Sequence, residues 1–289
     1  QDRGLLTLIK ERFSIPVHAS TQMAIHSLAG SRWAREQGID RVILARELGL
    51  EQVQSIAEES PVDVEVFIHG ALCYCFSGQC LFSSFLGGRS GNRGMCAQPC
   101  RKPYKIGDRE GYLLSTADTF GVDSIPGLLR SGVVSLKIEG RMRSPQYVYY
   151  ASKIYSQAIR RAKEGAHPLI TEREREVLEV VFNRGFSGGY LTNREVMQTD
   201  HPESRGRPLG PASMLAGTLK MPRGALEAGD GISIYRGREK VGGFDLRPSD
   251  LRAEEVLATP PFPLADGAYS VYKTKDREFQ LLEGLISKI

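Results

Sequence analysis

VEVFIHGALCYCFSGQCLFSSFLGGRSGNRGMCAQPCRKPY, residues 64–104, decides how the fold is interpreted, because it holds all five cysteines of the 289 residues. It begins with an apolar run, Val64 to Ile68, which predicts a β-strand. The rest is rich in Gly, Ser, Arg and Asn and has no hydrophobic period. A loop of this length inside a compact domain is usually functional or disordered. The clustered cysteines favour function, since a ligand that they shared would order the loop.

The cysteine spacing indicates a metal or cluster site. Cys73 and Cys80 are separated by six residues, Cys80 and Cys96 by fifteen, and Cys96 and Cys100 by three. Structural zinc usually takes short pairs, and only the last pair approaches that pattern. An iron–sulfur cluster tolerates irregular spacing, whereas disulfides fit poorly with an odd count and a start that does not resemble a secretion signal. The spacing leaves zinc and iron–sulfur equally open. Cys75 is expected outside the set, because its side chain would point away from that of Cys73 if the strand continued.

Several motifs resemble peptidase family U32, the collagenase-like peptidases. The cysteine stretch EVFIHGALCYCFSGQC resembles the family signature, and further similar motifs occur in the expected order over nearly the whole chain. They are HASTQM (18–23), RELGLEQV (46–53), GRSGNRGMCAQPCR (88–101), LKIEGRMRSPQYV (136–148) and NRGFSGGYL (183–191).

The resemblance implies a fold and a chemistry. Related proteins hydroxylate pyrimidines in tRNA or ribosomal RNA, with prephenate as co-substrate and a bound iron–sulfur cluster. Others perform an oxygen-independent hydroxylation in ubiquinone synthesis, and the family name implies a peptidase. With this added, we expect a 4Fe-4S cluster, with zinc as the alternative. The expected cofactor and metal ligands are Cys73, Cys80, Cys96 and Cys100. Some relatives have their fourth cysteine much further downstream, so the fourth ligand is left open.

Composition and charge describe an ordinary globular protein. The hydrophobic content is 41% and the charged content is 25%. No apolar run approaches the ~20 residues that span a membrane, so we expect a cytoplasmic protein with no membrane partner. The net charge is only +4, but basic residues cluster in the cysteine loop and after a later strand. This pattern favours an anionic substrate such as RNA or a carboxylate metabolite, and the alternative is a solvated basic surface.

Strands and helices alternate over the first part of the chain, which predicts parallel βα units of an α/β fold. The expected strands are 15–19, 41–45, 64–68, 112–115 and 133–138, and the expected helices are 22–37, 50–59, 118–130 (interrupted by Pro126) and 145–164. Under the family resemblance these form a partial (β/α)8 TIM-type barrel that lacks its first three strands, which would precede residue 1. The rival interpretation is a complete small open α/β sheet.

Three regions are expected. Residues 1–165 form the truncated barrel with a cysteine-rich loop at 71–104. Residues 166–207 form a helical connector and arm, with a helix at 171–182 that starts with a capping box. Its NRGFSGGYL stretch is either a glycine-rich hairpin or a segment returning to the barrel mouth. Residues 208–289 form a small all-β, barrel-like domain, in which 226–234 resemble the LxxGDxIxI turn and strand of small β-barrels in translation proteins.

Polar side chains follow all five expected strands, and the carboxyl ends of parallel strands lie on one side of a sheet. We therefore expect a site there, although each residue singly has a structural alternative, such as His18 capping a helix or Glu47 pairing with an arginine. The expected catalytic residues are His18, Glu47, His69, Lys137, Glu139 and Arg141. The expected substrate-binding residues are Gln22, Arg89, Arg93 and Arg101.

Two function classes compete. The first is an enzyme that hydroxylates RNA, with tRNA or rRNA as partner and a prephenate-like small carboxylate as co-substrate. The second is a peptidase, for which the sequence has no HExxH or GxSxG motif and only the weak pairing of Cys73 with His69. A zinc hydrolase using the four cysteines would have no open position on the metal. A third alternative is an inactive fragment or a binding module.

Overall fold

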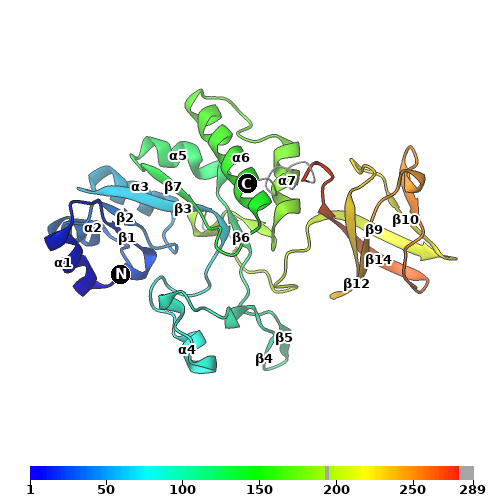
Figure 1. The fold of residues 1–289 in the computed structure, drawn as a ribbon, viewed down its shortest axis with the longest axis horizontal. Coiled ribbons are helices and arrows are strands. Elements are labelled where there is room, and N and C mark those ends of the chain that lie inside the picture. Colours follow the sequence, from blue (N-terminus) through cyan, green and yellow to red (C-terminus); the bar gives the residue numbers. More distant parts are fainter. Residues whose placement is uncertain (193–194, 280–289) are drawn as a thin grey trace. The chain divides into compact units, whose positions relative to one another are not determined.

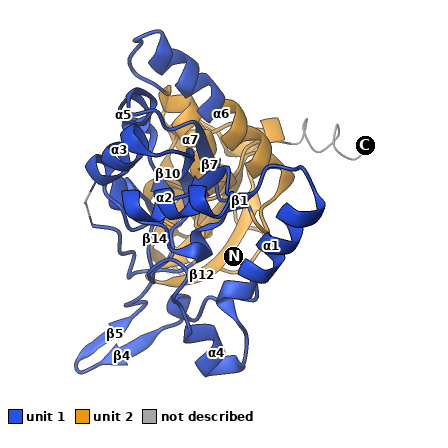
Figure 2. Cartoon of the chain, turned by 90° about the vertical axis from the view of Figure 1, so that its left-hand side faces the viewer, with its two compact units in different colours: residues 1–140, 155–169, 185–202 blue, residues 141–154, 170–184, 203–289 orange. Residues whose placement is uncertain are grey.

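The computed structural model describes residues 1–192 and 195–279. The chain divides into two compact units, coloured separately in Figure 2. Unit 1 comprises residues 1–140, 155–169 and 185–202, and unit 2 comprises 141–154, 170–184 and 203–289. The domain boundaries expected at 165 and 207 stay predictions, and the expected last region extends over 280–289, outside the described residues.

Unit 1 is built on a six-stranded mixed sheet with β3 (Asp63–Ala71) at its centre (Figure 1). β1 (His18–Ala19), β2 (Arg41–Ile43), β3 and β7 (Ser135–Ile138) pair in parallel in that order. β6 (Asp118–Phe120) pairs antiparallel with the end of β3, and β8 (Phe186–Ser187) pairs in parallel with β6. β3 is covered on both faces, as its apolar sequence predicts.

Helices follow the strands of unit 1. They are α2 (Leu28–Glu36), α3 (Leu50–Glu59), α5 (Ile125–Arg130) and α6 (Pro145–Lys163), while α1 (Arg3–Arg12) precedes β1; α6 begins in unit 2 and ends in unit 1. Short 3-10 turns lie at η1 (Thr21–Met23), η4 (Val122–Ser124) and η5 (Gly189–Thr192). α3 matches its predicted bounds because Val53 and Ile56 form one buried stripe on it.

The cysteine-rich loop extends from the carboxyl end of β3, on the side away from α3 and α5 (Figures 1 and 2). It contains α4 (Phe82–Gly87), η2 (Gly91–Arg93) and η3 (Pro99–Arg101), and a hairpin of β4 (Tyr104–Ile106) with β5 (Arg109–Gly111) follows. The rings of Phe82 and Tyr104 stack with centroids 5.9 Å apart, which joins α4 to the hairpin. The projection is therefore folded rather than an open loop.

Two predicted elements are wrong. Residues 112–115 are not a strand but a turn, closed by the Ser115 nitrogen donating to the Tyr112 carbonyl at 2.8 Å. The Ser115 and Thr116 side chains bind the buried guanidinium of Arg101, and Thr116 forms only an isolated bridge with Met197 before β6 begins. The helix expected at 118–130 begins at Ile125, since β6 occupies 118–120. Pro126 lies at the start of α5 and initiates it instead of interrupting it.

The fold class is α/β, and the predicted parallel βα units are present, but the described strands form no closed barrel. β3 pairs with both β6 and β7, so the sheet branches at its centre. The NRGFSGGYL segment pairs with the sheet through β8 and β6, and its predicted return to the barrel mouth stays a prediction. The TIM-type barrel itself stays a prediction.

Unit 2 contains a six-stranded antiparallel sheet in the order β12-β11-β14-β9-β10-β13. Its strands are β9 (Arg207–Leu215), β10 (Thr218–Pro222), β11 (Gly231–Arg236), β12 (Glu239–Asp245), β13 (Glu255–Ala258) and β14 (Gly267–Lys275), with a 3-10 turn η6 (Pro248–Asp250). Leu219, Ile234 and Val256 are fully buried in its core. The predicted all-β module is therefore confirmed as a sheet, and among the described strands β12 and β13 remain its two edges.

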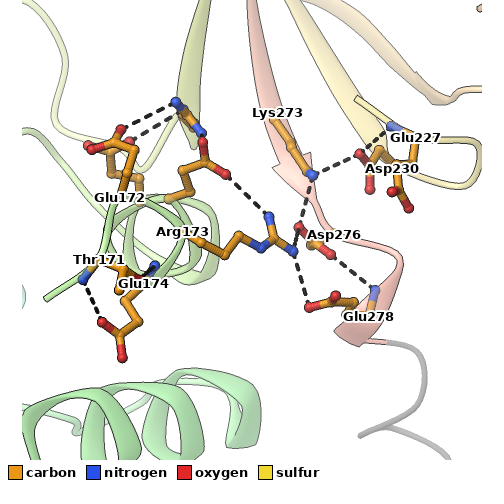
Figure 3. A network of polar contacts seen from close by, with 12 residues as sticks. Thr171, Glu172, Arg173, Glu174, Glu227, Asp230, Lys273, Asp276 and Glu278 are labelled. Carbon is orange, nitrogen blue, oxygen red and sulfur yellow. Dashed lines mark hydrogen bonds and ion pairs between the residues drawn. The ribbon is translucent and has the colours of Figure 1, made fainter. Parts of the chain in front are cut away.

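An ion-pair network holds α7 (Glu172–Val181) against this sheet (Figure 3). Arg173 of α7 pairs with Asp276 at 2.8 Å and with Glu278 at 3.1 Å. Lys273 of β14 pairs with Asp230 at 2.7 Å and with Asp276 at 2.8 Å, and all three of these side chains are buried. Burial alone would raise the pKa of Asp276, but the Lys273 hydrogen bond and other contacts hold it below its usual value.

None of the described helices has both the length and the hydropathy to cross a bilayer.

Candidate functional site

Glu47, which follows β2, holds the start of the cysteine loop. Its carboxylate accepts hydrogen bonds from the backbone nitrogen of Ser77 at 3.1 Å and from the Ser77 hydroxyl at 2.8 Å. The same hydroxyl accepts a hydrogen bond from the backbone nitrogen of Arg46 at 3.2 Å. Bonds to an ionised acceptor are stronger than neutral ones. The structure thus joins the ends of β2 and β3 through a residue expected to be catalytic.

Gln22, an expected substrate-binding residue after β1, lies against the same loop. Its backbone contacts Gly78 so closely that a Cβ on that glycine would lie 2.5 Å from the Gln22 carbonyl oxygen. The Gly78 φ of +74° also favours glycine. Asn92 donates to the Gly78 carbonyl at 2.9 Å. The ends of β1, β2 and β3 therefore meet at residues 77–78, as the parallel sheet predicts.

Arg101 fixes the far end of the loop. Its buried guanidinium donates to the Leu72 carbonyl at 3.3 Å, to the Ser115 hydroxyl at 2.7 Å and to the Thr116 hydroxyl at 2.9 Å, and it also contacts the Thr116 carbonyl. The Thr116 hydroxyl itself donates to the Leu72 carbonyl at 2.7 Å. We expected Arg101 to bind substrate, whereas the structure commits its guanidinium to the chain itself. Its substrate contact is therefore not supported by its position.

The four expected ligand cysteines lie near one another. Burial, helped by interactions with Cys73, Cys96 and Cys80, raises the pKa of Cys100 to about 11 against the opposing effect of Arg101. All five cysteines are free thiols. The sulfurs of one loop are therefore within electrostatic reach of each other, although they are widely separated in sequence.

Cys75 is closer to this group than the sequence suggested. Burial raises its pKa, and interactions with Cys80, which include a hydrogen bond, and with Cys73 add to the shift. The expectation that its side chain points away fails because β3 ends at Ala71, before Cys73. The expected ligand set of Cys73, Cys80, Cys96 and Cys100 stays a prediction.

Hydrogen bonds within the loop hold the sulfur of the exposed Cys96. Ser83 of α4 donates to the Cys96 sulfur at 3.8 Å and accepts from the Ala97 nitrogen at 3.0 Å, while the Gln98 nitrogen donates to the same sulfur at 3.3 Å. Over residues 1–192 and 195–279, no three His, Cys, Asp or Glu side chains are arranged to hold a metal ion. The thiols are thus neighbours in this structure without being at ligand spacing.

His69 is a buried residue at the end of β3. It is 1% exposed, and its ring lies among those of Phe120, Tyr155 and Phe186, with centroids 5.0–6.2 Å away. The Tyr155 hydroxyl lies 3.1 Å from Nδ1. Burial lowers the pKa of His69 to about 4, against the attraction of Asp118. The imidazole is therefore neutral at pH 7 and is enclosed by aromatic rings.

A cluster of charged side chains surrounds Glu65 on the central strand β3. Glu65 pairs with Lys137 at 3.3 Å and with Arg41 at 3.5 Å. Burial would raise the pKa of Glu65, but a Ser135 hydrogen bond and Lys137 hold it below its usual value. The cations of Lys137 and Arg46 each lie 5.5 Å from the Phe67 ring centre. Lys137, an expected catalytic residue, thus lies with Arg46 beside the ring of Phe67.

Tyr190 is a site residue that the pattern of polar residues at the strand ends does not predict. It lines a small cavity with Arg46, Phe67 and Thr119. Burial raises its pKa, and interactions with Cys73 and Glu47 raise it further. Its signal in the sequence was the glycine cluster of NRGFSGGYL, which lets η5 approach β6: a Cβ on Gly189 would lie 3.2 Å from the Thr119 hydroxyl.

The remaining expected residues lie in other surroundings or in the second unit. His18 is exposed and interacts with Asp40, at the start of β2. The Glu139 backbone nitrogen donates to the His69 carbonyl at 2.9 Å. Arg89 and Arg93 are exposed on the projecting loop, and Arg141 is exposed in unit 2. The structure therefore brings together Gln22, Glu47, Lys137 and the cysteines around Arg46, Phe67 and Tyr190.

Comparisons with known proteins show the family of this chain. The model of the family described as peptidase family U32 matches residues 1–201. A 23S rRNA 5-hydroxycytidine synthase of Escherichia coli (strain K12) is 33% identical over 84% of this chain and 40% of its own length. A collagenase of Porphyromonas gingivalis is 32% identical over 86% of this chain and 61% of its own length. A tRNA hydroxylation protein of Bacillus subtilis is 35% identical over 50% of this chain and 38% of its own length.

The chain thus spans between 38% and 61% of the length of these three relatives. No solved structure matches the chain.

Proposed function

Because the chain belongs to peptidase family U32, we propose that it is part of an enzyme that hydroxylates a pyrimidine in tRNA or ribosomal RNA. The observation that carries this proposal is the gathering of Cys73, Cys80, Cys96 and Cys100 beside Glu47 and Tyr190. Two relatives have names that state RNA hydroxylation or hydroxycytidine synthesis. Such a substrate is found in the cytoplasm, where we propose that the protein acts.

The donor set fits a 4Fe-4S cluster held by those four cysteines. Thiolates are the ligands of such clusters, and the irregular spacing suits a core wider than a single ion. When bound, a cluster would supply electron transfer at the edge of the sheet where substrate enters. Zinc is the alternative occupant of the same thiols. Glu47 and Arg101 have the supporting role, because they hold the two ends of the loop that carries the thiols.

Arg46 supports a small carboxylate as co-substrate, of which prephenate is the example that the family resemblance implies. Its Nε is buried and has no hydrogen-bond partner among the described residues. Its side chain lines the cavity with Phe67 and Tyr190. A guanidinium binds a carboxylate through paired hydrogen bonds, and the cavity, at about 20 Å³, is the size of such a group and not of a ring. We therefore assign Arg46 to carboxylate binding and Tyr190 to the wall of the same pocket.

The test is the nucleoside content of RNA from a strain that lacks the full-length gene. The proposal predicts loss of one hydroxylated pyrimidine, restored by the wild-type gene and by Cys75→Ser but not by Cys80→Ser. An Arg46→Gln gene should restore it only when the carboxylate is supplied in excess. An unchanged nucleoside profile in the deletion strain would contradict the proposal.

Peptidase activity is the second candidate, because one relative is named collagenase. The position of His69 counts against it as the general base of a peptidase. Its imidazole is enclosed by three rings, and its Nδ1 lies 3.1 Å from the Tyr155 hydroxyl. If the full-length protein cleaves gelatin and His69→Asn abolishes cleavage in a folded protein, this candidate replaces the first. If neither activity is found, the remaining alternative is a binding module.

A further inference from the structure

We propose that the projection, residues 72–111, is the surface that binds RNA, and that it takes an unpaired stretch rather than a duplex. This inference rests on the proposed function and names the part of the chain that would contact the RNA. It is carried by three observations on the same segment: its charge, its exposed apolar side chains and its attachment to the candidate site.

The charge of the projection is strongly positive. Residues 72–111 contain six of the 38 basic residues and only two of the 34 acidic ones, Asp108 and Glu110. The rest of the chain, with 32 basic and 32 acidic residues, has no net charge. Five of the six cations in this segment are exposed, namely Arg89, Arg93, Lys102, Lys105 and Arg109. Such a segment attracts a polyanion, whereas the remaining surface does not.

Exposed apolar side chains gather on the same segment. Seven of the sixteen large exposed hydrophobic residues of the described chain lie in residues 72–111. Phe85 on α4 is 85% exposed and Phe76 is 66% exposed. A phenylalanine in water loses the burial that normally stabilises it, so a ring that projects this far indicates a partner. Base stacking on aromatic rings next to arginines is how proteins bind unpaired RNA.

The combination of exposed cations and exposed aromatic rings on one segment favours RNA over protein as the partner. A protein interface of the same apolar content would be depleted in lysine at its centre. A duplex has its bases stacked on each other and offers phosphates but no free base face. Rings interleaved with cations therefore match an unpaired strand best.

The projection also leads to the candidate site. The cysteines lie within it, and Arg101 and Thr116 fix its two ends to Leu72 at the end of β3. Within the projection, Asn92 and Ser83 fasten η2 and α4 to the backbone near Gly78 and Ala97. An unpaired RNA strand that bound to these cations and rings would thus be held on the same folded segment as the cysteine thiols.

The experiment measures RNA binding to the full-length protein by fluorescence anisotropy, with an unpaired oligonucleotide and a duplex of the same sequence as probes. Phe85→Leu keeps an apolar side chain but removes the ring. It should weaken binding of the unpaired probe about 5-fold to 100-fold, as expected for one stacked base, and leave duplex binding unchanged. Phe85→Tyr keeps the ring and should bind within about 3-fold of wild type, a margin well inside the effect of one stacked base.

A second variant tests the charge. Arg93→Gln should lower the slope of log affinity against log salt by about 0.7, the value for one phosphate contact on a single strand. Glu110→Gln, which lies in the same hairpin region, is the control and should not lower the slope. Thermal unfolding and cysteine-bound iron should be unchanged in all variants, which separates binding from folding.

The proposal is overturned if Phe85→Leu binds the unpaired probe as wild type does, or if it weakens the duplex equally. It is also overturned if the full-length protein protects Phe85 from hydroxyl-radical labelling without RNA, because the ring would then be covered by protein. Failure of this inference can be told apart from failure of the proposed function. If the deletion strain loses the hydroxylated pyrimidine but Phe85→Leu binds RNA as wild type does, only the binding surface is wrong. If the nucleoside profile of the deletion strain is unchanged, the proposed reaction is wrong, whatever the RNA-binding result.

Discussion

Arg101 donates a hydrogen bond to the carbonyl oxygen of Leu72 at 3.3 Å, across 29 residues of chain. Leu72 ends the strand side of the cysteine loop, and Arg101 also binds Ser115 and Thr116 on its return side. One buried guanidinium thus fixes both ends of the loop that holds the cysteines. This contact explains how a glycine-rich and serine-rich stretch can keep a defined shape.

Arg101→Lys should loosen the loop, because a lysine cannot donate in the same fork. We expect a loss of about 2–4 kcal/mol in the free energy of unfolding, from several charge-assisted bonds and buried acceptors left unpaired. Limited proteolysis should cut faster within residues 72–116. Arg93→Lys, at an exposed position, is the matched control and should change stability by no more than about 0.5 kcal/mol. Equal proteolysis of both variants would show that Arg101 does not close the loop.

Glu47 and Ser77 should be coupled in a double-mutant cycle. Glu47→Gln and Ser77→Ala each remove part of the same pair of hydrogen bonds, which measure 3.1 and 2.8 Å. We expect an interaction energy of about 1–2 kcal/mol, within the range for residues in direct contact. Chemical denaturation of the four proteins measures it. Additive effects of the two changes would indicate that Glu47 acts elsewhere, for example on substrate.

His69 should make the protein less stable in acid. Its folded-state pKa, about 4, lies below the usual 6.5, so between these values the unfolded chain binds a proton that the folded chain does not. Stability is retained above pH 6.5 and falls as the pH decreases toward 4, by roughly 3 kcal/mol in total. His69→Phe removes this titration and should flatten the dependence over that window. If both proteins lose stability equally from pH 6.5 to 4, the imidazole is not neutral and buried.

The ion-pair network of unit 2 should be sensitive to loss of one partner. Lys273→Met leaves the buried carboxylates of Asp230 and Asp276 without their shared cation. We expect a loss of about 3–5 kcal/mol, the usual result of breaking a buried ion pair from one side. Adding Asp230→Asn to this variant should restore part of the loss. Lys275→Met, whose bridge to Asp245 is exposed, should cost no more than about 1 kcal/mol.

Local patterns in the sequence predicted the elements that local forces determine. The α3 helix was predicted with its observed bounds because its apolar period is regular. The capping box of Thr171 and Glu174 marked the start of α7. Alternation of strands and helices predicted the parallel pairing of β1, β2 and β3, whereas a strand at 112–115 was expected between β3 and β7. The expected meeting of polar groups at the strand ends is observed for Glu47 and Gln22.

Contacts between distant residues could not be predicted in this way. The strand expected at 112–115 is a turn, and Arg101, which lies outside it, binds the Ser115 and Thr116 side chains. Tyr155 reaches His69 across 86 residues, and Tyr190 reaches the neighbourhood of Cys73 from beyond α7. No periodicity encodes such pairs, since each depends on how the elements pack. The nearness of Cys75 to Cys80 was missed for a simpler reason, because the end of β3 was unknown.

The cysteine site is tested most directly by iron and acid-labile sulfide in the full-length protein purified without oxygen. We predict a brown protein with a broad absorption near about 400 nm and about four iron and four sulfide per chain, as for a 4Fe-4S cluster. Cys80→Ser should lose both, and Cys75→Ser should retain them. A colourless protein with one zinc per chain, lost in the same Cys80→Ser variant, would contradict the account.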